Sequence, residues 1–287
     1  MMREAKLILD DGSQFEGRSF GYETDAVGEV VFNTAMTGYP ESLTDPSYAG
    51  QMLVMTYPLV GNYGVPETGG DVLPKFMESE RIHVKALIVA DYSEQYSHWN
   101  AKESLASWLK REKIPAITGI DTRRLTQVLR EHGVMMGRIV LSEEVKSEQF
   151  NYGSVNWVEK VSCKEVITYQ SIGEKHHRVV LVDCGVKANI IRCLIKRGIE
   201  VVRVPWDYDF NELEFDGLFL ANGPGDPEQC SKTVEHIRTF LNNEHVRPCM
   251  GICLGNQLLA RAAGAKTYKL KYGHRSHNQP VQRVGTT

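Results

Sequence analysis

The chain has 287 residues, of which 42% are hydrophobic and 24% charged, and its formal net charge is −3. This length suits two domains, and the near-neutral balance excludes a strongly basic protein that binds nucleic acid or an anionic membrane. No apolar run approaches the roughly 20 residues that span a bilayer, so we expect a cytoplasmic protein.

The first part of the chain is predicted to open with strands and to continue with helices. Residues 7–9 and an extended segment from Phe15 flank the dipeptide Asp11-Gly12, a pattern typical of a β-hairpin. The last helical pattern is capped by Asp121 and ends at Gly133. We therefore predict a mixed α/β domain over residues 1–145. Its other elements are strands at 30–32, 52–56 and 86–90 and helices at 104–111 and 122–131.

Residues 146–177 have mixed polar character without sustained periodicity, so we predict that they connect two domains. From Arg178 onward, strands and amphipathic helices alternate, which indicates a doubly wound parallel sheet in a second domain over residues 178–287. Ligand sites in such sheets lie beyond the carboxyl ends of the strands. The predicted strands are 179–183, 200–204, 217–221 and 248–252, and the predicted helices are 189–197, 234–241 and 257–263.

The last predicted strand leads into the run Gly251-Ile252-Cys253-Leu254-Gly255, which places a thiol on a tight strand-to-helix turn. Amide groups at the start of the next helix favour a thiolate there, and a thiolate is a nucleophile. The cysteines form no CxxC pair, which argues against a disulfide framework and a zinc ribbon. An ordinary packing cysteine is the alternative for Cys253. The other five are predicted to pack: Cys163, Cys184, Cys193, Cys230 and Cys249.

A second glycine-rich loop, Asn222-Gly223-Pro224-Gly225-Asp226-Pro227, follows the predicted strand that ends at Ala221. It leaves the sheet from the same edge as the cysteine turn, so we expect the two loops to converge. Glycine lets the main chain approach a ligand closely, and its N–H group can point at a developing oxyanion. Asp226 and Pro227 also favour the start of a helix. The alternative is a tight turn with a helix cap and no further role.

These loops resemble those of a class I, triad-type glutamine amidotransferase. The resemblance rests on the cysteine turn with Gln257, on residues 222–227 and on the run GHRSHNQP at 273–280. The first half resembles the amino-terminal domain of the small, glutamine-hydrolysing subunit of carbamoyl-phosphate synthetase. The runs that carry this second resemblance are TGYPE at 37–41, LTDPSY at 43–48 and TYPLVGNYG at 56–64. Together they cover essentially the whole chain and imply a flavodoxin-like amidotransferase domain behind the first domain.

The resemblance implies a role for each matching residue. Cys253 is the nucleophile that attacks the side-chain amide of glutamine, and the main-chain N–H groups of Gly223 and Leu254 hold the oxyanion. Ammonia leaves, and water hydrolyses the glutamyl thioester that remains. The residues expected to contact glutamine are Ser47, Gly223, Gly225, Leu254 and Gln257.

A partner is implied as well, because free ammonia is protonated in bulk water and loses its nucleophilicity. In the family this partner is a large synthetase subunit, in a heterodimer or a higher assembly, which makes carbamoyl phosphate from bicarbonate and ATP for arginine and pyrimidine synthesis. The chain has no Gly-x-x-x-x-Gly-Lys-Ser/Thr run. We therefore expect no cofactor in this subunit, and ATP and Mg²⁺ on the partner.

The sequence departs from the family at its carboxyl end. A thiolate needs a base, which the family supplies as a His-x-Glu motif, and the sequence reaches Thr287 before such a motif. We expect an amidotransferase domain that is incomplete at this end, and little glutaminase turnover by the chain alone. His274 and His277 are alternatives as a base or a metal pair, but in the family this run is a loop on the substrate side.

Two other functions stay open at this point. The first is a non-catalytic regulatory or assembly subunit, which would keep the synthetase interface without glutaminase activity. The second is another cysteine hydrolase on a similar sheet, which explains the cysteine turn but neither the first domain nor the loop at 222–227. Among residues with structural roles, we expect Cys184 at a strand end, Cys249 in the core, and His176 and His177 on the surface.

Overall fold

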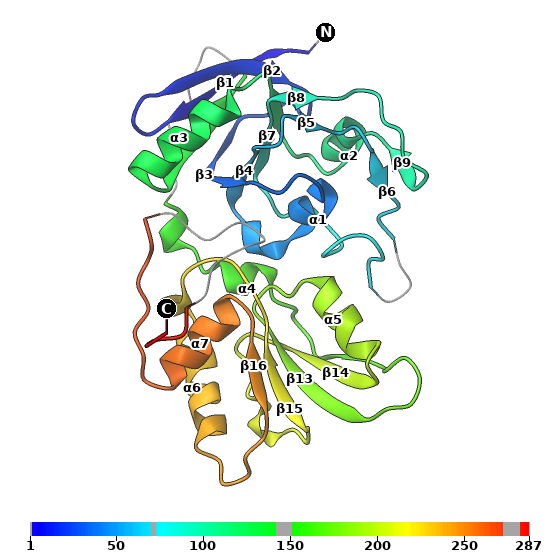
Figure 1. Cartoon of the computed structure of the whole chain (residues 1–287), viewed down its shortest axis with the longest axis vertical. Coiled ribbons are helices and arrows are strands. Elements are labelled where there is room, and N and C mark those ends of the chain that lie inside the picture. The colour runs from blue at the N-terminus through cyan, green and yellow to red at the C-terminus, as the bar shows by residue number, and fades with distance from the viewer. Residues whose placement is uncertain (1, 70–72, 142–150, 272–281, 287) are drawn as a thin grey trace.

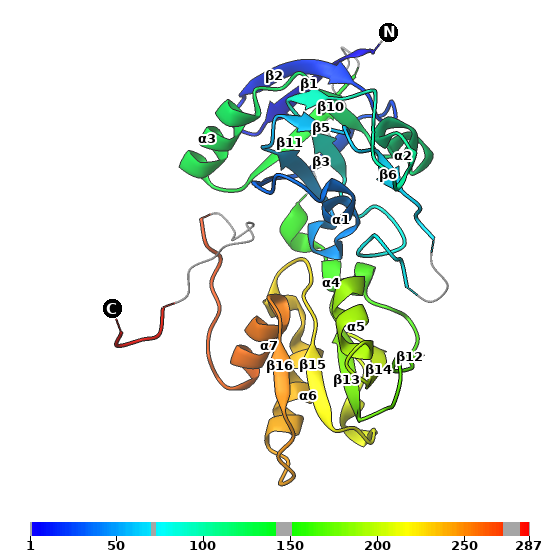
Figure 2. The ribbon, with the colours of Figure 1, turned by 45° about the vertical axis from the view of Figure 1, so that its right-hand side comes forward.

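The computed structural model describes residues 2–69, 73–141, 151–271 and 282–286. Two parts lie one above the other, and the short helix α4 (Trp157–Val161) lies between them in both views (Figure 1, Figure 2). Among the described residues, no helix has both the length and the apolar character that crossing a bilayer requires.

Seven strands of the first part close into a barrel in the order β1-β11-β3-β4-β7-β10-β2. The predicted hairpin is confirmed, since β1 pairs with β2 antiparallel and Leu7 lies opposite Phe15. Closure of the barrel was not predicted, because β1 pairs with β11 at the far end of the domain and no local pattern signals that pairing. The strands are β1 (Glu4–Leu9), β2 (Gln14–Ser19), β3 (Ala26–Asn33), β4 (Gln51–Met55), β7 (Ala86–Ile88), β10 (Ala116–Thr118) and β11 (Met135–Val140).

The helices of the first part match their sequence signals. Helix α2 (Leu105–Arg111) is capped by Ser104, and α3 (Thr122–His132) is capped by Asp121, whose carboxylate accepts the N–H of Arg124 at 2.8 Å. Gly133 ends α3 with a φ of 94°. The short elements that complete this part are α1 (Tyr39–Thr44), η1 (Pro46–Tyr48), β5 (Leu59–Val60), β6 (Val65–Pro66), β8 (Asp91–Tyr92) and β9 (Ala101–Glu103).

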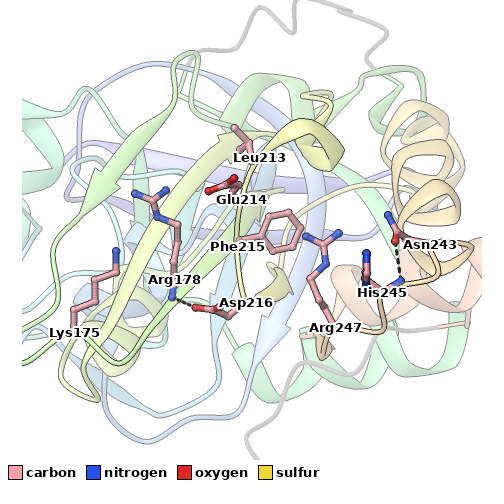
Figure 3. A pocket seen from close by; sticks show the side chains of 9 residues that line it. All are labelled: Lys175, Arg178, Leu213, Glu214, Phe215, Asp216, Asn243, His245 and Arg247. Atoms are coloured by element: carbon pink, nitrogen blue, oxygen red, sulfur yellow. Dashed lines mark hydrogen bonds between the residues drawn. The ribbon is translucent and has the colours of Figure 1, made fainter.

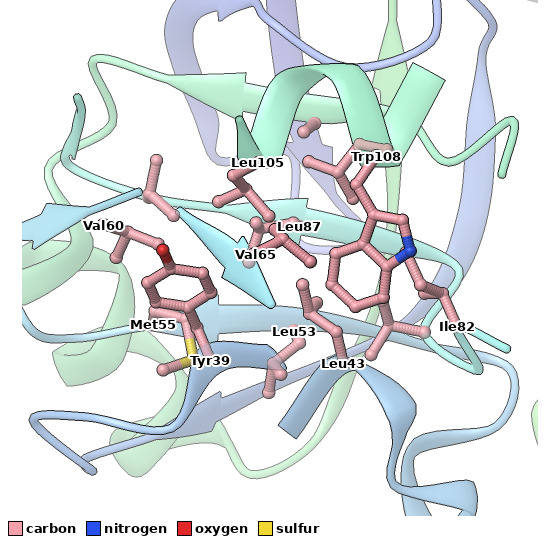
Figure 4. Packing of buried hydrophobic residues seen from close by; sticks show 14 of the residues in the cluster. Tyr39, Leu43, Leu53, Met55, Val60, Val65, Ile82, Leu87, Leu105 and Trp108 are labelled. Atoms are coloured by element: carbon pink, nitrogen blue, oxygen red, sulfur yellow. The ribbon is translucent and has the colours of Figure 1, made fainter. Parts of the chain in front are cut away.

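The wholly buried strand β4 separates two hydrophobic clusters of the first part. Leu53 packs with α1 and α2 around Trp108, which is 1% exposed (Figure 4). Met52 and Val54 belong to the other cluster, which includes the buried side of α3. Successive side chains of a strand point to opposite faces, so a continuous apolar run is what a strand between two clusters requires.

The second part is a five-stranded sheet in the order β12-β14-β13-β15-β16. The last four strands are parallel, and β12 is antiparallel to β14. Helix α5 covers one face, where Leu181 meets Ile191, while α6 and α7 cover the other, where Val180 and Val182 lie. The strands are β12 (Ile167–Tyr169), β13 (His177–Asp183), β14 (Ile199–Pro205), β15 (Gly217–Leu220) and β16 (Cys249–Gly251). The helices are α5 (Ala188–Ile195), η3 (Phe210–Glu212), η4 (Pro227–Gln229), α6 (Ser231–Leu241) and α7 (Leu254–Ala262).

The segment predicted as a connection carries structure of its own. It contains η2 (Tyr152–Ser154), the helix α4 and the edge strand β12. Each of these elements is three to five residues long, too short for a periodic pattern to be visible in the sequence. The division into residues 1–145, 146–177 and 178–287 stays a prediction.

Candidate active site

Cys253 lies between β16 and α7 in a backbone conformation that L-amino acids rarely adopt. Its φ is 52° and its ψ is −110°, and Lys113 is the other non-glycine residue with positive φ among those described. The side chain is exposed. Strain of this kind costs on the order of 1–3 kcal/mol and persists only where the surroundings enforce it. The turn therefore has the geometry of a nucleophile elbow.

The two glycines of the cysteine turn are needed because the turn is tight and because Gly255 lies directly on the end of β15. A Cβ atom on Gly255 would lie 2.2 Å from the carbonyl oxygen of Leu220, and one on Gly251 would lie 2.6 Å from the amide nitrogen of Asn256. The amide of Ile252 also donates to the Leu220 carbonyl at 3.0 Å. Close packing therefore holds the turn at the carboxyl edge of the sheet, where the sequence predicts a site.

The structure brings the second glycine loop to the cysteine turn. A Cβ atom on Gly223 would lie 1.9 Å from the carbonyl oxygen of Cys184 and 3.0 Å from Cδ2 of Leu254. Gly225, two residues on, has a φ of +83° that favours glycine. The loop is thus wedged between the end of β13 and the residue after Cys253. That the Gly223 and Leu254 N–H groups hold an oxyanion stays a prediction.

The helix start expected at Asp226 and Pro227 is a single 3₁₀ turn. The Asp226 carboxylate accepts the N–H of Glu228 at 2.9 Å and so caps η4. The α-helix α6 begins only at Ser231, because Cys230 is buried with φ −103° and ψ 39° and interrupts the helical geometry. The cap was predicted correctly, but the length of the turn before α6 has no sequence signal.

Asn222 links the loop to the first part of the chain. Its side-chain amide nitrogen donates to Ser47 Oγ and to the carbonyl of Gly185, each at 2.9 Å, and its Oδ1 accepts the N–H of Lys187 at 3.2 Å. The side chain is 2% exposed, so these bonds satisfy a buried amide. Ser47, named by the resemblance, therefore lies at the loop. Asn222 itself was named only as the first residue of the glycine run.

An ion pair crosses the same boundary beside Ser47. The Nζ atom of Lys187 lies 2.7 Å from Oδ2 of Asp45, whose other oxygen accepts the N–H of Ser47 at 2.9 Å. Burial lowers the pKa of Lys187, but the Asp45 carboxylate, together with Glu78 and Tyr48, outweighs burial, so that pKa is raised. The turn that carries Ser47 is thereby anchored to the second part.

A buried carboxylate organises the main chain under Gly223. Asp183 is fully buried and accepts the N–H groups of Gly185 at 2.9 Å and Val186 at 2.8 Å. Arg203 donates to it from Nε at 2.9 Å and from Nη2 at 2.6 Å. Burial lowers the pKa of Arg203, but the interactions with Asp183 and Tyr169 together outweigh burial and raise that pKa. No sequence pattern predicts this pair, and its signal is limited to an acidic residue at the end of a buried strand.

The cysteines differ sharply in surroundings. Burial raises the pKa of the Cys249 thiol to about 11, that of Cys163 and Cys230 to about 12, and that of Cys184 well above its ordinary value. Thiols held in the neutral form are poor nucleophiles. Cys253 is the exposed one among the six, which separates it from the cysteines expected to pack.

Gln257 and the histidine run complete the set of predicted site residues. Gln257 is exposed on the first turn of α7, and its backbone N–H donates to the carbonyl of Cys253 at 3.2 Å. Residues four apart share a helix face, so it lies on the side where the cysteine turn begins. His274 and His277 lie outside the described residues. Among the described ones, no group of three His, Cys, Asp or Glu side chains is arranged to hold a metal.

A hollow of about 640 Å³ lies away from Cys253, at the amino ends of the parallel strands (Figure 3). Arg247 lies over the ring of Phe215 at 4.1 Å, and Arg178 donates its N–H to Asp216 at 2.7 Å. The remaining lining residues are Lys175, Leu213, Glu214, Asn243 and His245. Because the sites of such sheets lie at the opposite edge, this hollow has no part in the chemistry of Cys253.

Comparison with known proteins identifies relatives over nearly the whole chain. The family described as carbamoyl-phosphate synthase small chain, CPSase domain, matches residues 7–139, and glutamine amidotransferase class-I matches residues 180–286. The carbamoyl phosphate synthase arginine-specific small chain of Saccharomyces cerevisiae is 50% identical over 99% of this chain and 71% of its own length. That of Neosartorya fischeri is 47% identical over 98% of this chain and 64% of its own. The multifunctional protein CAD of Squalus acanthias is 50% identical over 98% of this chain, which spans 13% of that protein.

Proposed function

Because the chain belongs to the family of carbamoyl-phosphate synthase small chains and carries a class I glutamine amidotransferase domain, we propose that Cys253 hydrolyses glutamine to glutamate and ammonia. The observation that carries this proposal is the juxtaposition at the carboxyl edge of the sheet. An exposed cysteine on a strained elbow lies next to Leu254, whose side chain touches Gly223 in the second glycine loop.

The proposed reaction is acyl transfer through a thioester. The Cys253 thiolate attacks the side-chain amide carbon of glutamine, and the carbonyl oxygen gains the negative charge. The C–N bond then breaks, a proton reaches the leaving nitrogen, and ammonia departs. Water adds to the thioester and releases glutamate and the thiol. Proton transfer needs a general base, which the resemblance assigns to a His-x-Glu motif and to none of the described residues.

The two glycine loops supply the stabilisation in this proposal. The main-chain N–H groups of Gly223 and Leu254 meet the charge that develops on the oxygen, and each such donor is worth about 2.7–4 kcal/mol. Ser47, Gly225 and Gln257 hold the rest of the glutamine. The hydrogen bond from Asn222 to Ser47 supports a pocket built from both parts of the chain.

We further propose that the ammonia passes to a large synthetase subunit, which binds ATP and Mg²⁺ and forms carbamoyl phosphate. Relatives named as arginine-specific small chains support a role in arginine synthesis, and multifunctional relatives support a physical link to further enzymes. The flavodoxin-like arrangement that the resemblance implies is supported by the parallel order β14-β13-β15-β16.

The test uses the full-length subunit in complex with its synthetase partner. Cys253→Ser is expected to reduce glutamine-dependent carbamoyl phosphate formation on the order of 10³-fold or more. A serine hydroxyl stays un-ionised and is a much weaker nucleophile than a thiolate. Ammonia-dependent formation by the partner stays within about twofold, since the replacement differs by one atom. Cys193→Ser is the control, and acid quenching with labelled glutamine traps a thioester in the wild type.

Two outcomes contradict the proposal. Equal loss of glutamine-dependent and ammonia-dependent synthesis would mean that Cys253 serves the assembly and not the glutaminase reaction. Full glutamine-dependent activity in Cys253→Ser, without a trapped thioester in the wild type, would favour a non-catalytic assembly subunit.

A further inference from the structure

Trp157, in the connecting segment, lies on the turn that carries Ser47. A Cβ atom built on Gly50 would lie 2.2 Å from both Cζ2 and Cη2 of the half-buried Trp157 indole. Gly50 also has a φ of +76°, so this position favours glycine in two ways. Gly50 follows η1, which contains Ser47, by two residues. The benzene edge of the indole therefore rests on the main chain of the Ser47 turn.

The other side of Trp157 faces the glycine loop of the site. A Cβ atom on Gly225 would lie 3.4 Å from Cβ and 3.6 Å from Cδ1 of Trp157. These are contacts between the start of the indole side chain and the main chain that is proposed to bind glutamine. One side chain thus fills the space between Gly50 in the first part and Gly225 in the second.

The indole is held rigidly in this position. Its Nε1 donates to the carbonyl of Tyr152 at 3.0 Å, and the two aromatic rings stack with centroids 5.1 Å apart and an interplanar angle of 22°. The hydroxyl of Tyr152 in turn donates to the carbonyl of Ala49 at 3.2 Å. Tyr152 therefore ties Trp157 to the residue beside Gly50.

The backbone around Trp157 is also tied to the second part. The side-chain amide of Gln229 donates to the carbonyl of Gly153 at 2.7 Å. Asn156 caps α4 by accepting the N–H of Glu159 at 3.1 Å, which fixes the start of the helix that carries the indole. Bonds on both sides of the boundary thus fix Trp157, so a change of its side chain acts on the distance between the two parts.

Resting on the proposed function, we propose that Trp157 is a positioning residue that sets the spacing between the Ser47 turn and the Gly225 loop, and thereby the affinity for glutamine. The two halves of the glutamine pocket come from different parts of the chain, so their separation decides how well one ligand meets both. A large aromatic ring between two glycines fixes that separation at low entropic cost.

The same geometry predicts that chemistry is affected less than binding. Gly223 is held by other groups, since it packs on the Cys184 carbonyl and follows Asn222, which is bound to Gly185. The cysteine turn packs on Leu220. Neither of these contacts involves Trp157. Loss of the indole is therefore expected to displace Gly225 and the Ser47 turn more than it displaces the attacking thiol or the oxyanion donors.

The first experiment compares Trp157→Ala, Trp157→Phe and wild type in the full-length complex with its synthetase partner. Trp157→Ala is expected to raise the KM for glutamine about tenfold with kcat within about threefold, since it removes ground-state and transition-state binding alike. Trp157→Phe keeps an aromatic ring beside Gly225 but lacks the benzene edge that meets Gly50, so its KM is expected to lie between those of the wild type and Trp157→Ala. The control is Trp99→Ala, since Trp99 is 85% exposed in the first part.

The second experiment uses Gly50→Ala to displace the indole without removing it. The added methyl group has no room beside Trp157, so this variant is also expected to raise the KM for glutamine. In the Trp157→Ala background the methyl group has space, so Gly50→Ala is expected to raise the KM there by a smaller factor than it does in the wild type. The strain of alanine at positive φ is present in both backgrounds and cancels in the comparison.

The outcomes separate this inference from the proposed function. If wild type traps a thioester on Cys253 but Trp157→Ala leaves the KM for glutamine unchanged, or lowers kcat alone, the inference is wrong and the glutaminase proposal stands. The inference would also be wrong if Gly50→Ala raised the KM by the same factor in the wild type and in the Trp157→Ala background. If wild type traps no thioester, the proposed function itself fails.

Fluorescence provides a test that does not require Trp157→Ala to fold. Glutamine binding between Ser47 and Gly225 is expected to change the emission of Trp157, so the glutamine-induced change in wild type is larger than that in Trp157→Phe. An equal change in both proteins would place the responding tryptophan elsewhere and overturn the inference.

Discussion

At the scale of single residues, the site depends on backbone positions that admit no side chain. Gly255 packs on the end of β15, and Gly223 packs on the carbonyl of Cys184. The sequence indicates the turn around Cys253, because a cysteine flanked by glycines between a strand and a helix is a local pattern. It does not indicate that Gly223 meets Cys184, because that contact depends on how β13 and β15 pair.

Gly223→Ala is predicted to disable the site while leaving most of the fold intact. The new methyl group would overlap the Cys184 carbonyl, 1.9 Å away, so the loop must move and the proposed oxyanion donor with it. Loss of one such donor lowers the rate of thioester formation on the order of 10²–10³-fold. Single-turnover acid quenching of the full-length subunit with labelled glutamine measures this rate.

The matched control for Gly223→Ala is Gly69→Ala, because a Cβ atom at Gly69 meets nothing within 4 Å. That control is expected to keep the wild-type rate. Thermal unfolding of both variants reports whether the fold has survived. A wild-type rate of thioester formation in Gly223→Ala would show that the loop does not contribute the donor.

His83 is predicted to make stability depend on pH. Burial, and then the charge of Arg81, lower the pKa of His83 from 6.5 to about 4, although Asp45 and Asp183 pull it upward. The unfolded chain therefore binds a proton at a higher pH than the folded chain does. The resulting stability is fully present above pH 6.5, is lost progressively as the pH falls below 6.5, and is gone once the pH has passed the folded pKa of about 4.

Between pH 7 and pH 5 this single group lowers the free energy of unfolding by about 2 kcal/mol. His83→Gln is expected to remove that part of the pH dependence, as measured by urea unfolding at the two pH values. His176→Gln, at an exposed position, serves as the control. An unchanged difference between pH 7 and pH 5 in His83→Gln would rule out this role.

At the scale of elements, the amino end of α5 is completed by the first part of the chain. The helix has no side-chain cap of its own at Lys187. Instead the carbonyl oxygen of Glu78 accepts the N–H of Ala188 at 2.8 Å, and its carboxylate accepts that of Asn189 at 3.0 Å. An acceptor at this end also complements the helix dipole. The loop around Glu78 thus holds the amino end of α5. This end comes directly after the main chain that binds the side chain of Asn222.

Glu78→Ala is predicted to lower the free energy of unfolding by about 1–2 kcal/mol, the usual effect of removing a helix cap. Burial raises the pKa of Glu78 more than the Asn189 N–H and the charges of Lys187 and Arg192 lower it, so its negative charge is partly a cost. Glu78→Gln keeps an acceptor without that charge and is expected to lose less than half as much. Urea unfolding at pH 7 measures both.

The exposed neighbour Glu80 supplies the control, and Glu80→Ala is expected to change stability by less than about 0.5 kcal/mol. Equal losses in Glu78→Ala and Glu78→Gln would contradict the capping role, because they would assign the effect to charge. An interaction between charges would also weaken with added salt, whereas a cap would not.

Elements with local signals were predictable, and elements set by distant pairing were not. Asp121 and Gly133 mark both ends of α3, and alternating strands and helices indicate the parallel sheet. By contrast, β12 is three residues long and joins the sheet by antiparallel pairing with β14, for which the sequence offers no periodic pattern. The α-helix expected at Pro227 begins at Ser231 for a similar reason, since buried Cys230 interrupts it.

At the scale of the whole molecule, the candidate site is composite. Cys253 and Gly223 belong to the second part, Ser47 belongs to the first, and Trp157 lies between them. The family resemblance places Ser47 in the pocket, whereas periodicity and spacing give no reason to join residues so far apart in sequence. The structure adds the physical connection, which consists of the Asn222 hydrogen bond and the ion pair between Lys187 and Asp45.

The measurement that tests the central proposal most directly is peptide mass mapping after reaction of the full-length subunit with an electrophilic glutamine analogue. A thiolate in a glutamine pocket reacts selectively, so the adduct is predicted on Cys253, and excess glutamine is predicted to prevent it. An adduct on Cys193 or another cysteine, or labelling of Cys253 that glutamine does not slow, would contradict the assignment of this residue as the glutaminase nucleophile.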